Sequence, residues 1–150
     1  MSQDYTARFT EVHKLGDWNQ PMTATAGQTW ATDYESMQQY QRAVYMVFVG
    51  AMAAGATFNF LLAQAQDAAG TNVKAIAGKQ ITELTQADGG ATSACIIEVR
   101  TEELDVDGGF THVAGISVTG VNNVTFCIIP LFFCANNPPV PTTEWAEIID

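Results

Sequence analysis

The chain has 150 residues, 47% of them hydrophobic, and a formal net charge of −10 from sixteen acidic and six basic residues. This length and hydrophobic fraction indicate one folded domain with a core and exclude a chain that is disordered by composition. The acidic balance argues against direct nucleic-acid binding, which needs clustered Lys and Arg. It suits high solubility or docking on a basic partner.

The first 27 residues are predicted to form a polar N-terminal arm. They contain scattered aromatic residues without a sustained period, and "DWNQPMTATAGQ" is rich in turn residues. The start, "MSQDYTARFTEV", lacks a basic stretch followed by an apolar core, so we expect no targeting segment and synthesis in a cytoplasm. From residue 28 the pattern becomes strand-like, because Trp30 alternates with polar neighbours in "QTWATDY". The following "ESMQQY" is interpreted as a loop or a short helical turn.

Residues 40–70, "YQRAVYMVFVGAMAAGATFNFLLAQAQDAAG", admit three interpretations: a membrane helix, a buried helix, or two strands joined by a turn. A membrane helix needs an unbroken run of ~20 apolar residues, whereas the run that starts at residue 43 is shorter and contains Gly50 and Gly55. "VYMVFV" is dense in β-branched and aromatic residues, and "TFNFLLAQAQ" alternates over much of its length. The sequence therefore predicts a hairpin of two long strands, connected by "GAMAAG", and no membrane span.

The remaining pattern continues as strands separated by turns. Strands are predicted in "GTNVKAIAGKQITEL", "ACIIEVR", "FTHVAGISVT" and "VTFCIIPLFF", with an acidic loop at "TEELDVDGG" that has room for one helical turn. About seven or eight strands, with turn signals roughly every ten residues, are typical of an antiparallel β-sandwich or barrel. We therefore expect an all-β fold with an N-terminal arm (1–27), a β-sandwich domain (28–134) and a proline-rich, acidic C-terminal tail (135–150).

Both arms carry large apolar side chains within otherwise polar sequence. Each is worth ~1.5–3 kcal/mol if fully buried, so leaving them on free tails would be unfavourable. Either the arms fold back on their own domain, or they anchor to a neighbouring subunit. Trp30 is interpreted as a core residue rather than an interface residue. The interface candidates are Tyr5, Phe9 and Trp18 in the N-terminal arm and Trp145, Ile148 and Ile149 in the C-terminal tail.

The histidines and cysteines form no grouping typical of catalysis or metal binding. His13 and His112 are the only histidines, and neither has a nearby nucleophile or second histidine in the sequence. Cys95, Cys127 and Cys134 lie in apolar runs, and an odd count without CxxC spacing argues against a disulfide framework or a zinc site. We interpret the cysteines as buried small hydrophobes and His112 as a structural residue.

The acidic residues admit two alternatives to plain surface charge. Glu98, Glu102 and Glu103 have the residue type of a glycosidase acid–base pair, but at the end of a strand beside an exposed loop they are interpreted as surface charge. Asp105 and Asp107 in "DVDGG" resemble part of a calcium loop, yet the full ligand spacing and the closing Glu are missing. An ion site and a solvated acidic loop both remain as interpretations there. We expect no enzyme activity and no cofactor.

Residues 28–133 are similar to a known family. The elements that carry the similarity are "TWATDYESMQQYQRAVYMVFVG", "GATFNFLLAQAQDAAGTNVKAIAGKQITEL", "CIIEVRTEELDVDGGFTHVAGISVTG" and "VTFCIIPLF", about two thirds of the chain. They resemble small head proteins of tailed bacteriophages, some of which are cement or decoration proteins of the capsid. The resemblance implies a jelly-roll-like sandwich, made in the bacterial host cytoplasm, that binds between major capsid subunits on an HK97-type shell as a homodimer or homotrimer. It transfers no catalytic residue.

Two rival functions accompany this expectation. The first is another virion part on the same fold, a head–tail connector or a tail component. The second is a carbohydrate-binding sandwich, which needs exposed aromatic rings in one plane. Tyr34, Tyr40 and Tyr45 are the residues available for such a plane. An enzyme is the least favoured reading.

Overall fold

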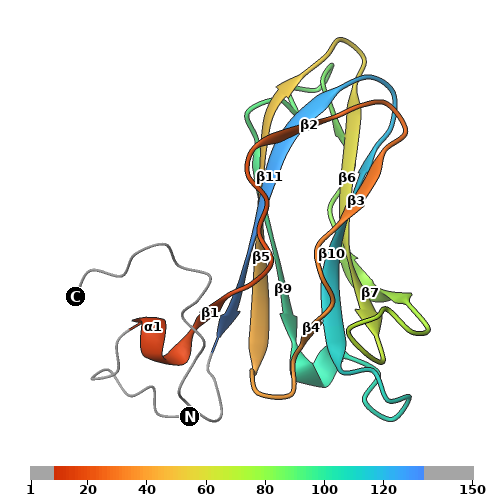
Figure 1. Ribbon diagram of the computed structural model, residues 1–150. Helices are drawn as coiled ribbons and strands as arrows, with labels where there is room; N and C mark the ends of the chain where they lie inside the picture. Colours follow the sequence, from red (N-terminus) through yellow and green to blue (C-terminus); the bar gives the residue numbers. More distant parts are fainter. Residues whose placement is uncertain (1–8, 134–150) are drawn as a thin grey trace.

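The computed structural model describes residues 9–133, apart from the side chain of Glu11. It is an all-β sandwich of two antiparallel sheets, jelly-roll-like in arrangement, as the sequence predicts (Figure 1). Helical structure within the described residues is limited to α1 (Phe9–Val12) and a 3-10 turn, Thr101–Glu103. The strands are β1 Lys14–Leu15, β2 Met22–Ala24, β3 Thr29–Ala31, β4 Glu35–Ser36, β5 Arg42–Met52, β6 Thr57–Ala65, β7 Lys74–Gln80, β8 Leu84–Thr85, β9 Ala94–Arg100, β10 His112–Thr119 and β11 Val124–Phe133.

The strands form one sheet of five strands, sheet A, and one of six strands, sheet B. Sheet A has the order β1-β11-β5-β9, and β2 also pairs with β11. Sheet B has the order β3-β10-β6-β7, with β4 beside β10 and β8 beside β6. Figure 1 shows the two layers standing face to face, with β11, β5 and β9 in one and β10, β6 and β7 in the other. The long strands were all expected from the sequence, and the short β1, β2, β4 and β8 were not.

The predicted hairpin of residues 40–70 is wrong, because β5 and β6 belong to different sheets. The connection between them crosses from one layer to the other, with Ala56 buried and Gly55 at φ +72°. Both strands direct alternate side chains into the same core, one from each side. A period of two marks a strand with an inward face, but it does not say whether the next strand lies beside it or opposite it.

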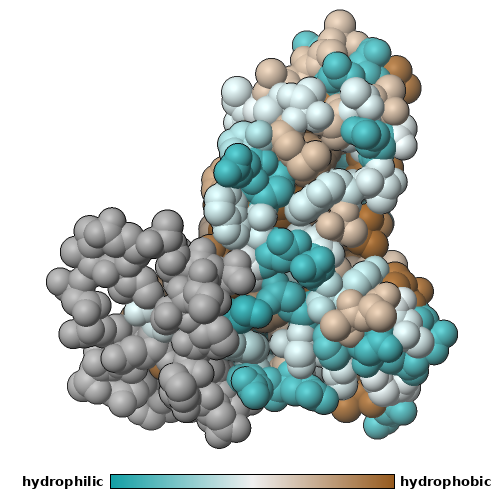
Figure 2. All heavy atoms as spheres, viewed as in Figure 1, coloured by the Kyte–Doolittle hydropathy of each residue, from teal (hydrophilic) through white to brown (hydrophobic). Residues whose placement is uncertain are grey.

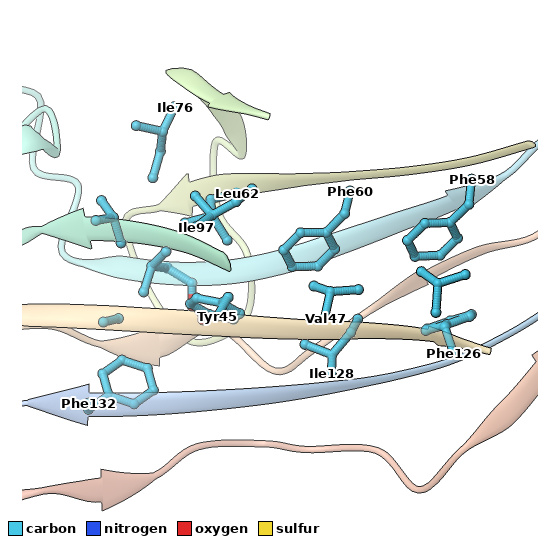
Figure 3. Packing of buried hydrophobic residues seen from close by; sticks show 14 of the residues in the cluster. Tyr45, Val47, Phe58, Phe60, Leu62, Ile76, Ile97, Phe126, Ile128 and Phe132 are labelled. Carbon is cyan, nitrogen blue, oxygen red and sulfur yellow. Dashed lines mark hydrogen bonds between the residues drawn. The ribbon is translucent and has the colours of Figure 1, made fainter. Parts of the chain in front are cut away.

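Aromatic and aliphatic side chains from both sheets fill the space between the layers. Figure 3 shows Phe58 and Phe60 of β6 directed toward residues of β5 and β11. The rings of Phe58 and Phe126 lie 5.0 Å apart between centroids, and those of Tyr45 and Phe60 lie 6.2 Å apart. These spacings are within the range in which aromatic pairs stabilise a core beyond their buried area. Trp30 packs against this cluster, as expected, although it is only partly buried.

Part of the predicted N-terminal arm forms the edge of sheet A. β1 and β2 both pair with β11, and the segment between them stays beside β11 through backbone hydrogen bonds from Gly16 N to Pro130 O (2.8 Å) and from Asn19 N to Ile128 O (3.2 Å). The side chain of Asn19 accepts a hydrogen bond from Ile128 N at 2.7 Å. Of the two explanations for the N-terminal arm, residues 14–24 therefore follow the first and fold onto their own domain. The domain boundary at residue 28 stays a prediction.

Candidate interaction surface

The outer face of sheet A carries apolar side chains in register across three strands. Met46 of β5 pairs with Ile96 of β9 on one side and with Ile129 of β11 on the other. In the next row Phe48 stands between Ala94 and Cys127. We call these six residues the apolar face.

Three members of the apolar face are exposed, namely Ala94 and the larger Ile96 and Phe48. Ile96 is 68% exposed and Phe48 is 43% exposed, whereas Met46, Ile129 and Cys127 are partly buried. Cross-strand neighbours on one face of an antiparallel pair lie close enough for their side chains to touch. The six residues therefore form one continuous apolar area rather than scattered exposed side chains, and such areas mark interaction sites.

The sequence contains a signal for this face in the length of its apolar runs. A strand with one solvent face alternates apolar and polar residues, whereas a strand covered on both faces is apolar throughout. "AVYMVFV" in β5, "ACII" in β9 and "FCIIPLFF" in β11 are continuous apolar runs. One side of each run fills the core. The other side lies on the apolar face or continues it toward Phe133.

Near the lower end of sheet A in Figure 1, α1 lies beside the outer face of the sheet. The rings of Phe9 and His13 stack at 4.3 Å between centroids, and the His13 ring meets Phe133 edge-on at 4.5 Å. On the same face, toward the β9 edge of the sheet, Arg42 and Glu98 form an ion pair at 3.4 Å. The helix α1 thus contacts the row of Phe133, and the apolar face begins two rows farther along.

Two of the six predicted interface residues lie within the described part of the chain. Phe9 is 47% exposed and Trp18 is 41% exposed. Phe9 is placed by α1 against Phe133, and Trp18 lies in the segment that runs beside β11. Both are near sheet A and both keep surface for a partner. Tyr5, Trp145, Ile148 and Ile149 lie outside the described residues.

Every basic side chain within residues 9–133 has a carboxylate partner. The five pairs are Lys14–Glu35, Arg42–Glu98, Lys74–Asp105, Lys79–Glu103 and Arg100–Glu102. A concave site at the lower end contains Arg42 and Arg100, but both guanidinium groups are paired in this way. Nucleic-acid binding needs cations that are available to phosphate groups. The pairing leaves the acidic surplus of the chain without a basic patch in the described region.

The acidic residues singled out in the sequence are occupied by hydrogen bonds and ion pairs. Glu98, Glu102 and Glu103 each pair with a different cation. The carboxylate of Asp105 accepts hydrogen bonds from Lys74 Nζ and from Gly108 N at 3.0 Å, and these bonds lower the pKa of Asp105 below its usual value. Bonds from Lys79 and from the Arg100 amide lower the pKa of Glu103 likewise. The arrangement favours surface charge for the three glutamates and a hydrogen-bonded turn for the Asp105 loop.

The histidine and cysteine side chains of the described region are packed against or bonded to neighbouring residues. The rings of the histidines are held by neighbours, since His112 Nδ1 lies 2.9 Å from Thr111 Oγ1 and His13 stacks on Phe9. Cys95 and Cys127 are free and partly buried, and desolvation raises the pKa of both thiols. Within residues 9–133, no three metal-ligating side chains come together and no helix is long and apolar enough to cross a membrane. Cys134 lies outside the described residues.

The three tyrosines proposed for a sugar-binding plane do not form an exposed one. Tyr45 is fully buried, its hydroxyl lies 3.4 Å from the carbonyl oxygen of Val113, and burial raises its pKa far above the usual value. Tyr40 is also buried, and its ring lies 5.5 Å from Phe132 between centroids. Only Tyr34 retains partial exposure. Stacking on a sugar requires accessible ring faces, so these residues give no support to a carbohydrate-binding surface.

No family model and no curated protein sequence matches this chain. Similar solved structures include a chain of infectious bursal disease virus, Gx strain (TM-score 0.48, 11% identity, 85% of this chain and 34% of that chain). They also include broad bean stain virus (0.47, 10%, 100% and 99%) and a carbohydrate-binding module of the β-sandwich superfamily (0.42, 11%, 84% and 57%). The chain spans about a third of the length of the bursal disease virus chains that it matches. With TM-scores below 0.5, these likenesses carry no weight for function.

Proposed function

We propose that this chain is a structural protein of a virus particle, and specifically a cement or decoration protein of a tailed-phage head. The observation that carries the proposal is the apolar face, where Phe48 and Ile96 present large side chains to solvent beside partly buried apolar neighbours. A surface of this kind acts by contact, not by chemistry. The sequence resemblance to phage head proteins supports the choice of particle.

The physical role of such a protein is to add contact area between shell subunits. A stable interface buries ~1,600 Å² in total, and a rigid sandwich loses little entropy when it docks. Phe9 and Trp18 are suited to contact the major capsid protein, because buried aromatic residues dominate binding energy at interfaces. Tyr5, Trp145, Ile148 and Ile149 are proposed as further anchors. The protein would be made in the bacterial host cytoplasm and reside on the capsid surface.

Copy number in purified particles tests this proposal. Quantitative mass spectrometry against an isotope-labelled standard of the chain should find on the order of hundreds of copies, as repeated binding across a symmetric shell requires. A count of roughly six or twelve would instead indicate a ring at the neck or tail. Absence from particles that are purified from a culture producing the chain would contradict a virion role altogether.

A further inference from the structure

We propose that the apolar face of sheet A is where two copies of this chain meet, sheet against sheet, about a two-fold axis. The inference deepens the proposed function and rests on it in one respect, that this face is an interaction surface. It adds the identity of the partner on that face, which is the chain itself. The capsid contacts are then left to Phe9, Trp18 and the other anchor residues.

The outer surface of sheet A has a size that suits contact with a second copy. Strands lie ~4.8 Å apart and same-face residues ~6.7 Å apart along a strand, so the apolar face spans about 14 Å by 13 Å. With the flanking rows of Val44 and Gly50 and the segment beside β11, the outer surface of sheet A spans about 20 Å by 27 Å. Two such faces bury on the order of 1,000 Å², the lower limit for a specific interface. The face is thus large enough for a second sandwich. Sheets that stack in this way are ~10 Å apart, a distance at which side chains such as Phe48 and Ile96 interdigitate.

The distribution of charge limits where two copies can meet. Each copy carries a net charge of −10, so two copies repel one another wherever acidic residues face acidic residues. The five strands of sheet A contain a single acidic residue, Glu98, and Arg42 neutralises it at 3.4 Å. The other described acidic side chains lie in loops or in the turn at residues 101–103, apart from Glu35 in β4 of sheet B. Figure 2 shows many hydrophilic residues on the side of the sandwich that it displays, where the edges of both sheets are seen. The strands of sheet B likewise contain one acidic residue, Glu35, which pairs with Lys14. Charge therefore permits a like-charged copy to approach either sheet, and the apolar face is what distinguishes sheet A.

The register of the rows across sheet A indicates how two copies would be oriented. A two-fold axis that lies in the interface, perpendicular to the strands and between the rows of Phe48 and Met46, places Phe48 against Met46 of the partner copy. Ile96 then meets the other apolar row, while Arg42 and Arg100 remain at the rim. An axis parallel to the strands would instead set the row that contains both arginines against itself. The geometry favours the first axis, which gives an apolar centre with a charged rim, the usual anatomy of an interface.

Light scattering coupled to gel filtration tests the pairing. At about 100 μM, well above a micromolar Kd, wild-type chain should elute at about twice the 16.1 kDa mass of one copy. Ile96→Glu places a charge on the apolar face beside Met46 and should elute at the mass of one copy. Val121→Glu is the matched control, because Val121 is 62% exposed but lies in the β10–β11 turn, outside sheet A. This control should remain paired.

Circular dichroism of each variant establishes that it is folded, and Ile96→Gln replaces Ile96→Glu if the latter unfolds. A wild-type chain that stays single, a trimer, or a folded Ile96 variant that pairs as wild type does would overturn the two-fold pairing. These outcomes are separate from the fate of the proposed function. A single-copy wild type that is abundant in particles removes only the pairing, whereas a paired chain that is absent from particles removes only the virion role.

Discussion

Gly115 in β10 occupies a position where the aromatic core leaves no space for a side chain. A Cβ at this residue would lie 2.5 Å from the Phe60 ring and 3.0 Å from the Tyr45 ring. Gly115→Ala should therefore lower the free energy of unfolding by about 1–3 kcal/mol, the usual cost of overpacking. Urea denaturation measures this change. Gly50→Ala is the control, since its nearest atom lies at an ordinary 3.5 Å, and an equal loss in both variants would argue against the crowding at Gly115.

Asp67 makes the stability of one turn depend on pH. Its carboxylate accepts hydrogen bonds from Thr71 Oγ1 (2.6 Å), Thr71 N (3.0 Å) and Ala69 N (3.0 Å), and these bonds lower its pKa below the usual 3.8. A carboxyl whose pKa is depressed by folding stabilises the fold above its unfolded pKa, and this contribution is lost as pH falls through the folded pKa.

Asp67→Ala should therefore have a lower melting temperature than wild type at pH 7, and the difference should shrink below pH ~4. Thermal scans of both proteins between pH 3 and 7 measure it. Asp88→Ala is a useful comparison. The Asp88 carboxylate accepts a hydrogen bond from the Thr85 side chain, whereas the Asp67 carboxylate accepts bonds from the Thr71 side chain and from two backbone amides. A difference at Asp67 that is constant across the whole range would rule out the carboxylate bonds as its source.

At the scale of elements, β11 organises sheet A because it pairs with β5 on one side and with β1 and β2 on the other. Asn19 lies in the segment between β1 and β2. Its side chain accepts a hydrogen bond from Ile128 N at 2.7 Å and donates one to Gln20 O at 2.9 Å. Asn19 is 9% exposed, so its bonds are shielded from water. The hydrogen bond to Ile128 attaches the middle of the N-terminal segment to β11.

Asn19→Ala should cost about 1–3 kcal/mol of unfolding free energy, because it leaves the buried amide of Ile128 without this partner. Hydrogen exchange should also become faster in the middle of β11. Gln20→Ala, at an exposed neighbour, should change neither quantity. Unchanged exchange at Ile128 in the Asn19 variant would mean that the N-terminal segment does not protect β11.

The sequence predicts the long strands well and their partners poorly. Ala94–Arg100 and Val124–Phe133 are strands with the bounds that the pattern gives, and Thr101–Glu103 forms the single helical turn for which the acidic loop had room. The assignment of β5 and β6 to a hairpin failed because alternation records only an inward face. β1 and β2 carry too few residues for a period, and backbone pairing with β11 defines them.

The interaction surface was only partly predictable for a related reason. Phe9 and Trp18 were named as candidates because aromatic residues in polar sequence are conspicuous; both are exposed near sheet A, and their role at an interface stays a prediction. Phe48 and Ile96 were missed because an apolar run is first interpreted as core. Only the strand register separates the inward from the outward residues of such a run. The length of the apolar runs in "YMVFV" and "CIIPLFF" was the available signal.

At the scale of the whole molecule, charge and apolar surface are segregated. The strands of sheet A carry one acidic residue, while the chain as a whole has a net charge of −10. Every described cation is already paired with a carboxylate. We propose that the acidic loops keep such a molecule in solution and that it binds partners through the apolar face and through Phe9 and Trp18. These are the physical requirements of a building unit in a larger assembly.

A cryo-electron microscopy reconstruction of purified particles tests this picture most directly. We expect density for the sandwich at many symmetry-related positions on the shell, with Phe48 and Ile96 covered by a second copy and the anchor residues against the major capsid protein. Particles without this density, or sandwiches whose outer sheet A face is bare to solvent at every position, would contradict it.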